Sequence, residues 1–408
     1  MKSTTIITYI FLSVTIFAML CGGSLKIGPL TLRNYVTVFL ALYSFFNRSY
    51  LTKNGVIEKY LIFVVVAIFC SIINGDAGNM SFWTGIVISY LLPSFIIYYA
   101  TLEFCNKYKK GSSQISNVLL VLFVINALIT ILQYYDNPIG WAIARTLSSG
   151  NLQSDSILDN YSGGDNFVGI AVAAGLFGYV TSNGYFIGAY SSISSKLSFS
   201  TNKITFVLGF LVLAIGAYAA FATQERMALL AILCNLACVF FYNSHNSRSS
   251  NIFIIIAALC VVAYISNNIT DYGRFSADTD NSDREQLYIA FRSFLKTDSV
   301  WFGSWSDYNS QFKGLNQHNT FMDEITRYGL VGLIPFVILF WNVAKFSIIH
   351  FFKARKKQLQ MIYIYASATL LYLLYSMTHG TGLQSGDVMF WLLFAVLAHE
   401  SNKNKLLL

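Results

Sequence analysis

Long apolar runs separated by short polar segments repeat along almost the whole chain. Each run approaches the roughly 20 residues that an α-helix needs to cross a bilayer. The runs are continuous, whereas the strands of a membrane β-barrel would alternate apolar and polar residues. We therefore predict an all-α polytopic integral membrane protein with about twelve transmembrane helices. The predicted spans are 4–22, 31–47, 60–74, 83–101, 116–135, 166–190, 204–222, 227–242, 251–267, 330–349, 361–378 and 388–399.

The composition supports a membrane protein. Of the 408 residues, 55% are hydrophobic and 11% are charged, whereas roughly a quarter of the residues of a soluble domain are charged. No soluble domain is appended, so residues 1–408 are predicted to form a single membrane domain. We find no matched pair of interrupted spans of the kind that many secondary transporters use.

The distribution of charge predicts the topology. Most basic residues fall in one set of loops, among them 107–110 and 353–357, and at both termini. The positive-inside rule makes that side, with both termini, cytoplasmic. The opposite side carries the longer polar segments 136–165 and 268–329. Because long polar loops often carry function, we expect the working face on this side, with 268–329 as a large loop.

Arg226 follows a very short turn between two apolar runs in "FATQERMALLAIL". A charge held so close to membrane depth is costly unless it faces a cavity or a partner, and Glu225 is a candidate partner. The alternative is an interfacial arginine that extends its guanidinium to water. Arg226 is therefore a candidate site residue.

Arg284 opens the stretch "NSDREQLYIAFRSFLKTDSVWFGSW", in which Leu287, Phe291, Phe294 and Leu295 share one helix face. This pattern predicts a short amphipathic helix at the membrane surface. A solvated arginine on such a helix is the alternative to a functional role for Arg284.

His318 lies in "NQHNTFMDEITRYGLVG", a polar stretch just before an apolar span. An imidazole at the rim of the membrane can exchange protons near neutral pH. A single histidine is more often a structural hydrogen-bonding residue, so its surroundings must decide.

The same stretch contains a histidine–asparagine pair, an aromatic and an apolar residue, and glycines eleven and fourteen residues after the histidine. These residues are His318, Asn319, Phe321, Met322, Gly329 and Gly332. They resemble a signature of the superfamily of O-antigen polymerases and O-antigen ligases. Members also carry a short turn with an arginine between two spans, which "TQER" resembles, and an arginine that opens an amphipathic helix before a glycine turn. Arg284 and Gly303 resemble the latter, and "LKIGPLTLRN" is similar to the family's opening.

The chain departs from the family pattern at three positions. Glu225, Asp298 and Arg327 stand where a small hydroxyl residue, a proline and an acidic residue are usual. These departures leave the detailed geometry of the site open rather than the class of protein.

The resemblance implies glycosyl transfer at the periplasmic face of the bacterial inner membrane, with 268–329 as a periplasmic loop. The donor would be an oligosaccharide on undecaprenyl pyrophosphate, and the acceptor a hydroxyl of another lipid-linked unit. Arg226 and Arg284 would stabilise the pyrophosphate leaving group, because guanidinium binds phosphate oxygens bidentately. His318 would act as general base. The expected enzyme inverts the anomeric centre and uses neither a metal nor another cofactor.

Further residues are candidates for substrate binding. Asn319 and Glu324 could orient the imidazole or the acceptor sugar, and Arg145 and Asn166 could line the sugar site from the outer segment. A solvated connector is the alternative for that segment. The expected partners are undecaprenyl-pyrophosphate-linked oligosaccharides and membrane lipid, with a chain-length regulator as an open candidate and no nucleic acid.

Three functions remain to be distinguished. A polymerase that joins repeat units of O-antigen or a capsule-like glycan is favoured by analogy. A ligase would use the same donor and transfer the glycan to lipid A–core. A transporter or flippase is less favoured, because its spans would be expected to carry ionisable residues near mid-membrane, and here the charges lie at the edges.

Overall fold

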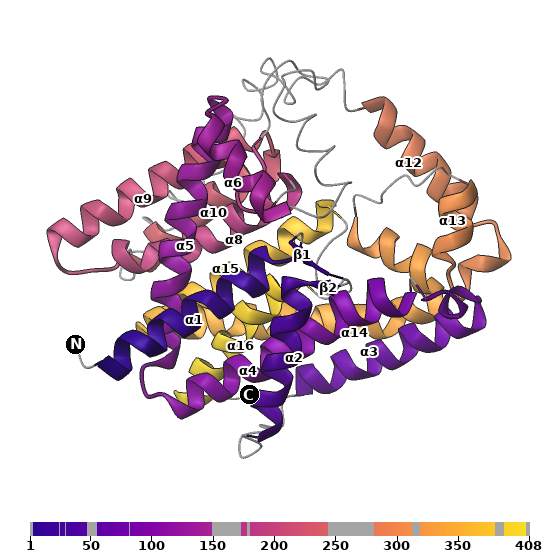
Figure 1. Ribbon diagram of the computed structural model, residues 1–408, viewed down its shortest axis with the longest axis horizontal. Coiled ribbons are helices and arrows are strands. Elements are labelled where there is room, and N and C mark those ends of the chain that lie inside the picture. Colours follow the sequence, from indigo (N-terminus) through magenta and orange to yellow (C-terminus); the bar gives the residue numbers. More distant parts are fainter. Residues whose placement is uncertain are drawn as a thin grey trace.

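The computed structural model describes residues 3–23, 25–28, 30–46, 55–80, 82–148, 173–177, 180–243, 281–311, 319–379 and 387–404. Within these residues the regular structure is fourteen α-helices, three short helices of other types and one two-stranded antiparallel hairpin. The protein is therefore all-α in its described parts (Figure 1).

The elements follow one another as helices joined by short turns. The first half contains α1 (Ser3–Cys21), β1 (Lys26–Ile27), β2 (Leu30–Thr31), α2 (Leu32–Phe46), α3 (Gly55–Ile73), η2 (Asp76–Gly78), the π-helix η3 (Phe82–Leu91), α4 (Leu92–Lys107), α5 (Gly111–Tyr134) and α6 (Pro138–Ser148). The second half contains α8 (Val180–Ser198), α9 (Lys203–Ala222), α10 (Arg226–Asn243), α12 (Asn281–Phe294), η5 (Asp298–Val300), α13 (Trp305–Gln311), α14 (Thr320–Lys357), α15 (Gln360–His379) and α16 (Val388–Lys403).

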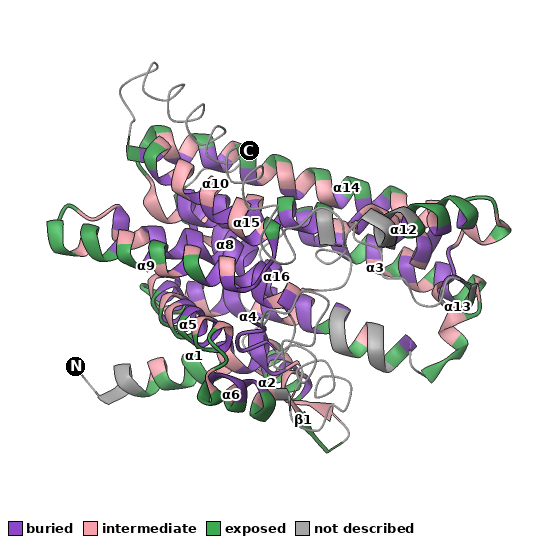
Figure 2. Cartoon of the chain, turned by 90° about the horizontal axis from the view of Figure 1, so that it is seen from above, coloured by how far each residue is buried: buried purple, intermediate pink, exposed green. Residues whose placement is uncertain are grey.

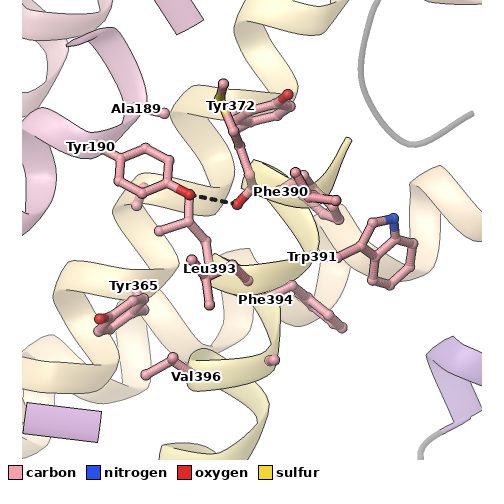
Figure 3. Packing of buried hydrophobic residues seen from close by; sticks show 14 of the residues in the cluster. Ala189, Tyr190, Tyr365, Tyr372, Phe390, Trp391, Leu393, Phe394 and Val396 are labelled. Carbon is pink, nitrogen blue, oxygen red and sulfur yellow. Dashed lines mark hydrogen bonds between the residues drawn. The ribbon is translucent and has the colours of Figure 1, made fainter. Parts of the chain in front are cut away.

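Three helices, α8, α15 and α16, form the centre of the bundle. All residues of α16 from Val388 to Ala398 are buried, and so is nearly every residue of α8. A helix that is buried on all sides belongs to the core of a large helical protein. Figure 3 shows how α8 and α16 meet: the Tyr190 hydroxyl donates to the Met389 carbonyl over 2.8 Å, among the rings of Tyr372, Phe390 and Trp391.

The surrounding helices carry apolar side chains on their outward faces (Figure 2). On α14, Ile334, Val337, Ile338 and Trp341 are exposed at helical spacing. Such a stripe would be unfavourable in water but is expected where a helix faces lipid. Among the described residues five helices are long and apolar enough to cross a membrane, namely α3, α5, α9, α10 and α14. The protein is a helical membrane protein, and the number of twelve crossings stays a prediction.

The predicted spans correspond closely to helices, with one difference. The span predicted for 166–190 begins as a helix only at Val180, because residues 173–177 form a turn. The span 251–267 lies outside the described residues. The outer segment 136–165 contains an additional helix, α6, that the sequence did not predict.

The bundle has two ends with different chemistry. One end, which we call the site end, carries residues 74–78, the turn 223–225 and the start of α14. The other, the basic end, carries residues 107–110 and 353–357. At the basic end the Lys196 ammonium donates to Asn117 Oδ1 over 2.8 Å, and Gln360 Nε2 donates to the Lys196 carbonyl over 3.0 Å. Helices α3 and α14 run side by side, with α12 and α13 beyond their site end (Figures 1 and 2).

Candidate functional site

The turn before Arg226 is held by its own side chains. Only residues 223–225 separate α9 from α10, and Gln224 takes a left-handed backbone conformation with φ 56°. Thr223 Oγ1 donates to the Ala220 carbonyl over 2.7 Å and accepts from the Glu225 amide over 3.2 Å. The turn buries Glu225 and leaves Arg226 exposed in the first turn of α10. The predicted tight turn is confirmed.

A second turn, residues 173–177, lies against the Arg226 turn. The Ala173 amide donates to the Ala222 carbonyl over 3.2 Å. Buried amide side chains supply the hydrogen bonds that a helix would otherwise provide: Asn126 Oδ1 accepts from the Leu176 amide, and Gln133 Oε1 accepts from the Gly175 amide, over 2.9 and 2.8 Å. Non-helical backbone at membrane depth is tolerated where protein groups satisfy it.

The amides of this turn form one network. Asn183 Oδ1 accepts from Asn126 Nδ2 over 2.7 Å, and Asn183 Nδ2 donates to Thr130 Oγ1 and to the Ala173 carbonyl, each over 3.0 Å. Sequence reasoning missed these residues, because it weighed only charged side chains inside the spans. Asparagine and glutamine within apolar runs are the signal that would have found them.

Asn319, next to His318 in the sequence, caps α14 and joins it to α15. Its Oδ1 accepts from the amides of Phe321 and Met322 over 2.9 and 3.3 Å, as a helix N-cap does. Its Nδ2 donates to the Met377 carbonyl over 2.9 Å. The amide that was predicted to bind substrate therefore also fixes the entrance of α14 against the last turns of α15.

The same turns of α15 face the Arg226 turn. A Cβ added at Gly184 of α8 would collide with the Tyr375 hydroxyl and would lie 3.3 Å from Glu225 Cγ. Gly184 thus leaves the room in which Glu225 and Tyr375 approach each other. Because Tyr375 lies two residues before Met377, the end of α15 contacts both the Arg226 turn and the cap beside His318.

Two predicted motif glycines meet at a backbone crossing. Gly303 and Gly329 have positive φ, 69° and 70°. A Cβ at Gly303 would collide with the Arg327–Tyr328 peptide, and a Cβ at Gly329 with the Trp301 carbonyl. The Ser304 amide donates to the Thr326 carbonyl over 3.0 Å, and the Val331 amide to the Trp301 carbonyl over 3.1 Å. The crossing bends α14 at Gly329 and locks the segment after α12 to it.

The loop after α3 holds this crossing from the other side. Asn74 Nδ2 donates to the carbonyls of Phe302 and Gly303 over 3.1 and 3.0 Å. The Asp76 carboxylate accepts from the Trp305 amide over 2.9 Å and from the Ser306 hydroxyl, which fixes the first turn of α13. These contacts join segments more than 200 residues apart in sequence.

The amphipathic helix predicted after Arg284 is α12. Its buried face consists of Leu287, Ala290 and Phe294, whereas Tyr288 and Leu295 are exposed. The helix contacts α14, so the Arg284 backbone lies in the first turn of an element that packs on the bent helix. The side chain of Arg284 lies outside the described residues.

Glu324 is the buried ionisable group of the bend. It is 0% exposed, and neither carboxylate oxygen has a hydrogen-bond partner among the described residues. The neighbouring Asp323 instead accepts from Arg327 Nε over 3.0 Å, and the Arg327 guanidinium lies 4.3 Å from the Trp305 ring centroid. An ionisable residue buried in a membrane protein is by default a candidate functional group.

Asp387 at the start of α16 is a further titratable group outside the spans. Its Oδ1 accepts from the Met389 amide over 2.8 Å as the N-cap of the helix. Burial raises the pKa of Asp387 to about 6, although the Met389 hydrogen bond and the Arg33 charge oppose the shift. Arg33 in turn donates from Nε to the Met19 carbonyl over 2.8 Å, which ties α1 to α2.

The structure describes some predicted site residues and not others. Arg226, Asn319 and Glu324 all lie at the site end, and Arg145 is exposed in the last turn of α6. His318 and Asn166 lie outside the described residues. Among the residues that the structure describes, no three of His, Cys, Asp and Glu gather in a way that could hold a metal ion, and the metal-independent reaction stays a prediction.

Comparison of the chain with known proteins gives no relative. No protein-family model matches the sequence, and no curated protein matches it significantly. The functional argument therefore rests on the residues themselves and on their arrangement at the site end.

Proposed function

We propose that the protein is a polyprenyl-pyrophosphate-dependent glycosyltransferase of the O-antigen polymerase type, acting at the periplasmic face of the inner membrane. One observation carries the proposal: the last turns of α15 contact both the Arg226 turn, through Tyr375, and the Asn319 cap beside His318. Two motifs that lie about 90 residues apart in sequence thus meet at one helix end.

The chemistry of these groups suits transfer from a pyrophosphate-linked sugar. Breaking the glycosidic bond develops negative charge on the pyrophosphate, and an exposed arginine at the membrane rim can bind its oxygens with a bidentate fork. Arg226 takes this position at the start of α10, and Arg284 opens the helix that packs on α14. Fixed positive groups of this kind lower the barrier because they need no reorganisation during the reaction.

His318 completes the proposed reaction as general base. It takes the proton of the acceptor hydroxyl while that oxygen attacks the anomeric carbon and the pyrophosphate leaves, which inverts the centre. The Asn319 cap supports this role, because its three hydrogen bonds fix the chain at the residue after the histidine. Positioned bases of this kind contribute about 10²–10⁴-fold.

The position in the cell follows from the charges. The basic end would face the cytoplasm with both termini, and the site end would face the periplasm. The substrates would be undecaprenyl-pyrophosphate-linked oligosaccharides that enter from the membrane. A ligase remains the second candidate, since it would use the same donor and the same charged groups.

Reconstitution of the purified protein in liposomes tests the proposal. With a single undecaprenyl-pyrophosphate-linked repeat unit as substrate, a polymerase produces longer lipid-linked chains without another enzyme. A ligase produces glycan-bearing lipid A–core only after lipid A–core is added. Movement of the lipid-linked unit across the bilayer with neither product would identify a transporter and overturn the proposal.

A deletion strain separates the two transferases in cells. Accumulation of core bearing one repeat unit indicates that a polymerase is lost. Undecorated core with intact lipid-linked polymer indicates that a ligase is lost, and would exclude the polymerase.

A further inference from the structure

An apolar groove lies in the basic-end half of the bundle, away from the candidate site. It has a volume of about 280 Å³ and is lined by α1, α2, α4, the start of α5 and α16. Leu12, Ile16, Leu40 and Ile97 form its buried wall. Ile7 and Phe11 of α1, which are 64% and 52% exposed, form its outer edge. The groove therefore opens from the core of the bundle toward the lipid-facing surface.

The mouth of the groove at the basic end is polar and positively charged. Tyr43 and Tyr108 line it, and tyrosines are common where a membrane protein meets the headgroup layer. The Lys107 ammonium lies 5.8 Å from the centroid of the Tyr43 ring. Lys107, Lys109 and Lys110 are all exposed in the turn that follows α4.

We propose that this groove is a binding site for one acyl chain of an anionic phospholipid, with the lipid phosphate held by the lysines of residues 107–110. The apolar wall matches a hydrocarbon chain, and the position of the lysines at the mouth matches a negative headgroup. Lysines next to a membrane surface favour anionic lipids in this way. The inference is independent of the proposed glycosyl transfer, because the groove lies in the opposite half of the bundle from the Arg226 turn.

The groove predicts selectivity, which ordinary contact with surrounding lipid does not. A lipid that merely surrounds the protein would contact the outward faces of α1 and α9 alike. A lipid held by the groove would place its chain between α1 and α4, beside Ala100 and Thr15, and would be preferred when its headgroup is anionic.

Photocrosslinking in nanodiscs tests the site. The full-length protein is embedded in phosphatidylcholine with a small fraction of phosphatidylglycerol that carries a diazirine on one acyl chain, and labelled peptides are mapped by mass spectrometry. We expect labelling of α1 and α4 about tenfold above that given by the matched phosphatidylcholine probe. Equal labelling by the two probes would overturn the proposal.

Variants that fill the groove provide the second test. Ala100→Phe on α4 and Thr15→Phe on α1 place a ring in the groove from opposite walls, so one remains informative if the other does not fold. Either should abolish the labelling of α1 and α4 while labelling at the exposed Val207 and Leu211 of α9 persists. Persistence of the groove labelling in a folded variant would contradict the proposal.

Matched lysine variants test the headgroup. Replacing Lys107, Lys109 and Lys110 by alanine should remove the preference for phosphatidylglycerol. Replacing Lys203, Lys356 and Lys357, which are also exposed, should leave it unchanged. Native mass spectrometry of the purified protein supplies an independent readout: bound phosphatidylglycerol supports the proposal, whereas a neutral lipid or a lipid-linked sugar as the bound species would overturn it.

Discussion

At the site end, α14 begins at the Asn319 cap, bends at Gly329 and encloses the Glu324 carboxyl. At the basic end, the same helix finishes with a run of arginine and lysines and stops at Gln358, whose φ is 55°. There the Arg355 guanidinium covers the Phe241 ring and donates to its carbonyl over 2.8 Å. One end keeps an ionisable group from water, and the other exposes its charges.

The difference indicates where the fold is constrained. At the basic end, charged residues meet water and complement the helix dipole, which costs little. At the site end, a positive-φ glycine, a backbone crossing and a buried carboxyl occur within one short stretch of α14. Such costly features persist where the surrounding structure holds them in place, and they gather at functional sites.

Replacing the glycine at the bend should have the largest effect. In Gly329→Ala, the added Cβ meets the Trp301 backbone, and the backbone conformation is one that only glycine adopts readily. We expect a loss of roughly 3 kcal/mol or more in the free energy of unfolding. Thermal unfolding in detergent measures it, with Gly78→Ala as control because nothing lies within 4 Å of that position. Equal midpoints for the two variants would contradict the close crossing.

The pH dependence at the start of α16 should come next. The pKa of Asp387 is about 6 in the folded protein and 3.8 ordinarily, so the folded state holds the proton more tightly. Its contribution to stability is therefore complete below pH 4 and is lost as the pH rises through 6, by up to about 3 kcal/mol. The partial exposure of Asp387 reduces this figure. Thermal midpoints at pH 4.5 and pH 7 should differ less in Asp387→Asn than in the unmodified protein, and an unchanged difference would show that another group is responsible.

Removing the buried carboxyl should stabilise the protein while it harms function. Glu324→Leu replaces an unpartnered acid by an apolar side chain of similar size, and we expect a gain of about 1–3 kcal/mol. Elongation of lipid-linked chains should fall if Glu324 serves the site. The control, Glu400→Leu at the basic end, breaks a pair in which Lys403 Nζ lies 3.7 Å from Oε1 and should bring no gain. Loss of stability in Glu324→Leu would show that the carboxyl has a partner.

The smallest effect is expected at the other end of α14. Gln358→Gly relieves a left-handed conformation that glycine adopts at no steric cost, while it removes the 3.0 Å bond from Gln358 Nε2 to the Arg355 carbonyl. The net change in stability should be a gain of no more than about 1 kcal/mol. A large loss would mean that the basic end is as constrained as the site end.

Apolar periodicity predicted most of the helices, because a membrane helix needs only a continuous apolar run and satisfies its own backbone. It could not predict the turn at 173–177, whose hydrogen bonds come from Asn126 and Gln133 about 40–50 residues earlier. The motif glycines were predicted to allow tight packing, and the crossing of Gly303 with Gly329 confirms it. That crossing depends on two segments meeting in space, which spacing along the chain does not encode.

The most direct test of the central claim is the elongation rate of reconstituted Arg226→Ala, compared with that of Arg292→Ala. Arg292 is exposed on α12 and serves as the matched control. If Arg226 stabilises the leaving pyrophosphate, its alanine variant should lose about 10²–10³-fold in elongation rate while it still inserts and folds. Arg226→Lys should recover only part of that rate, because it keeps the charge and loses the bidentate fork. Full elongation by Arg226→Ala would contradict the proposed site.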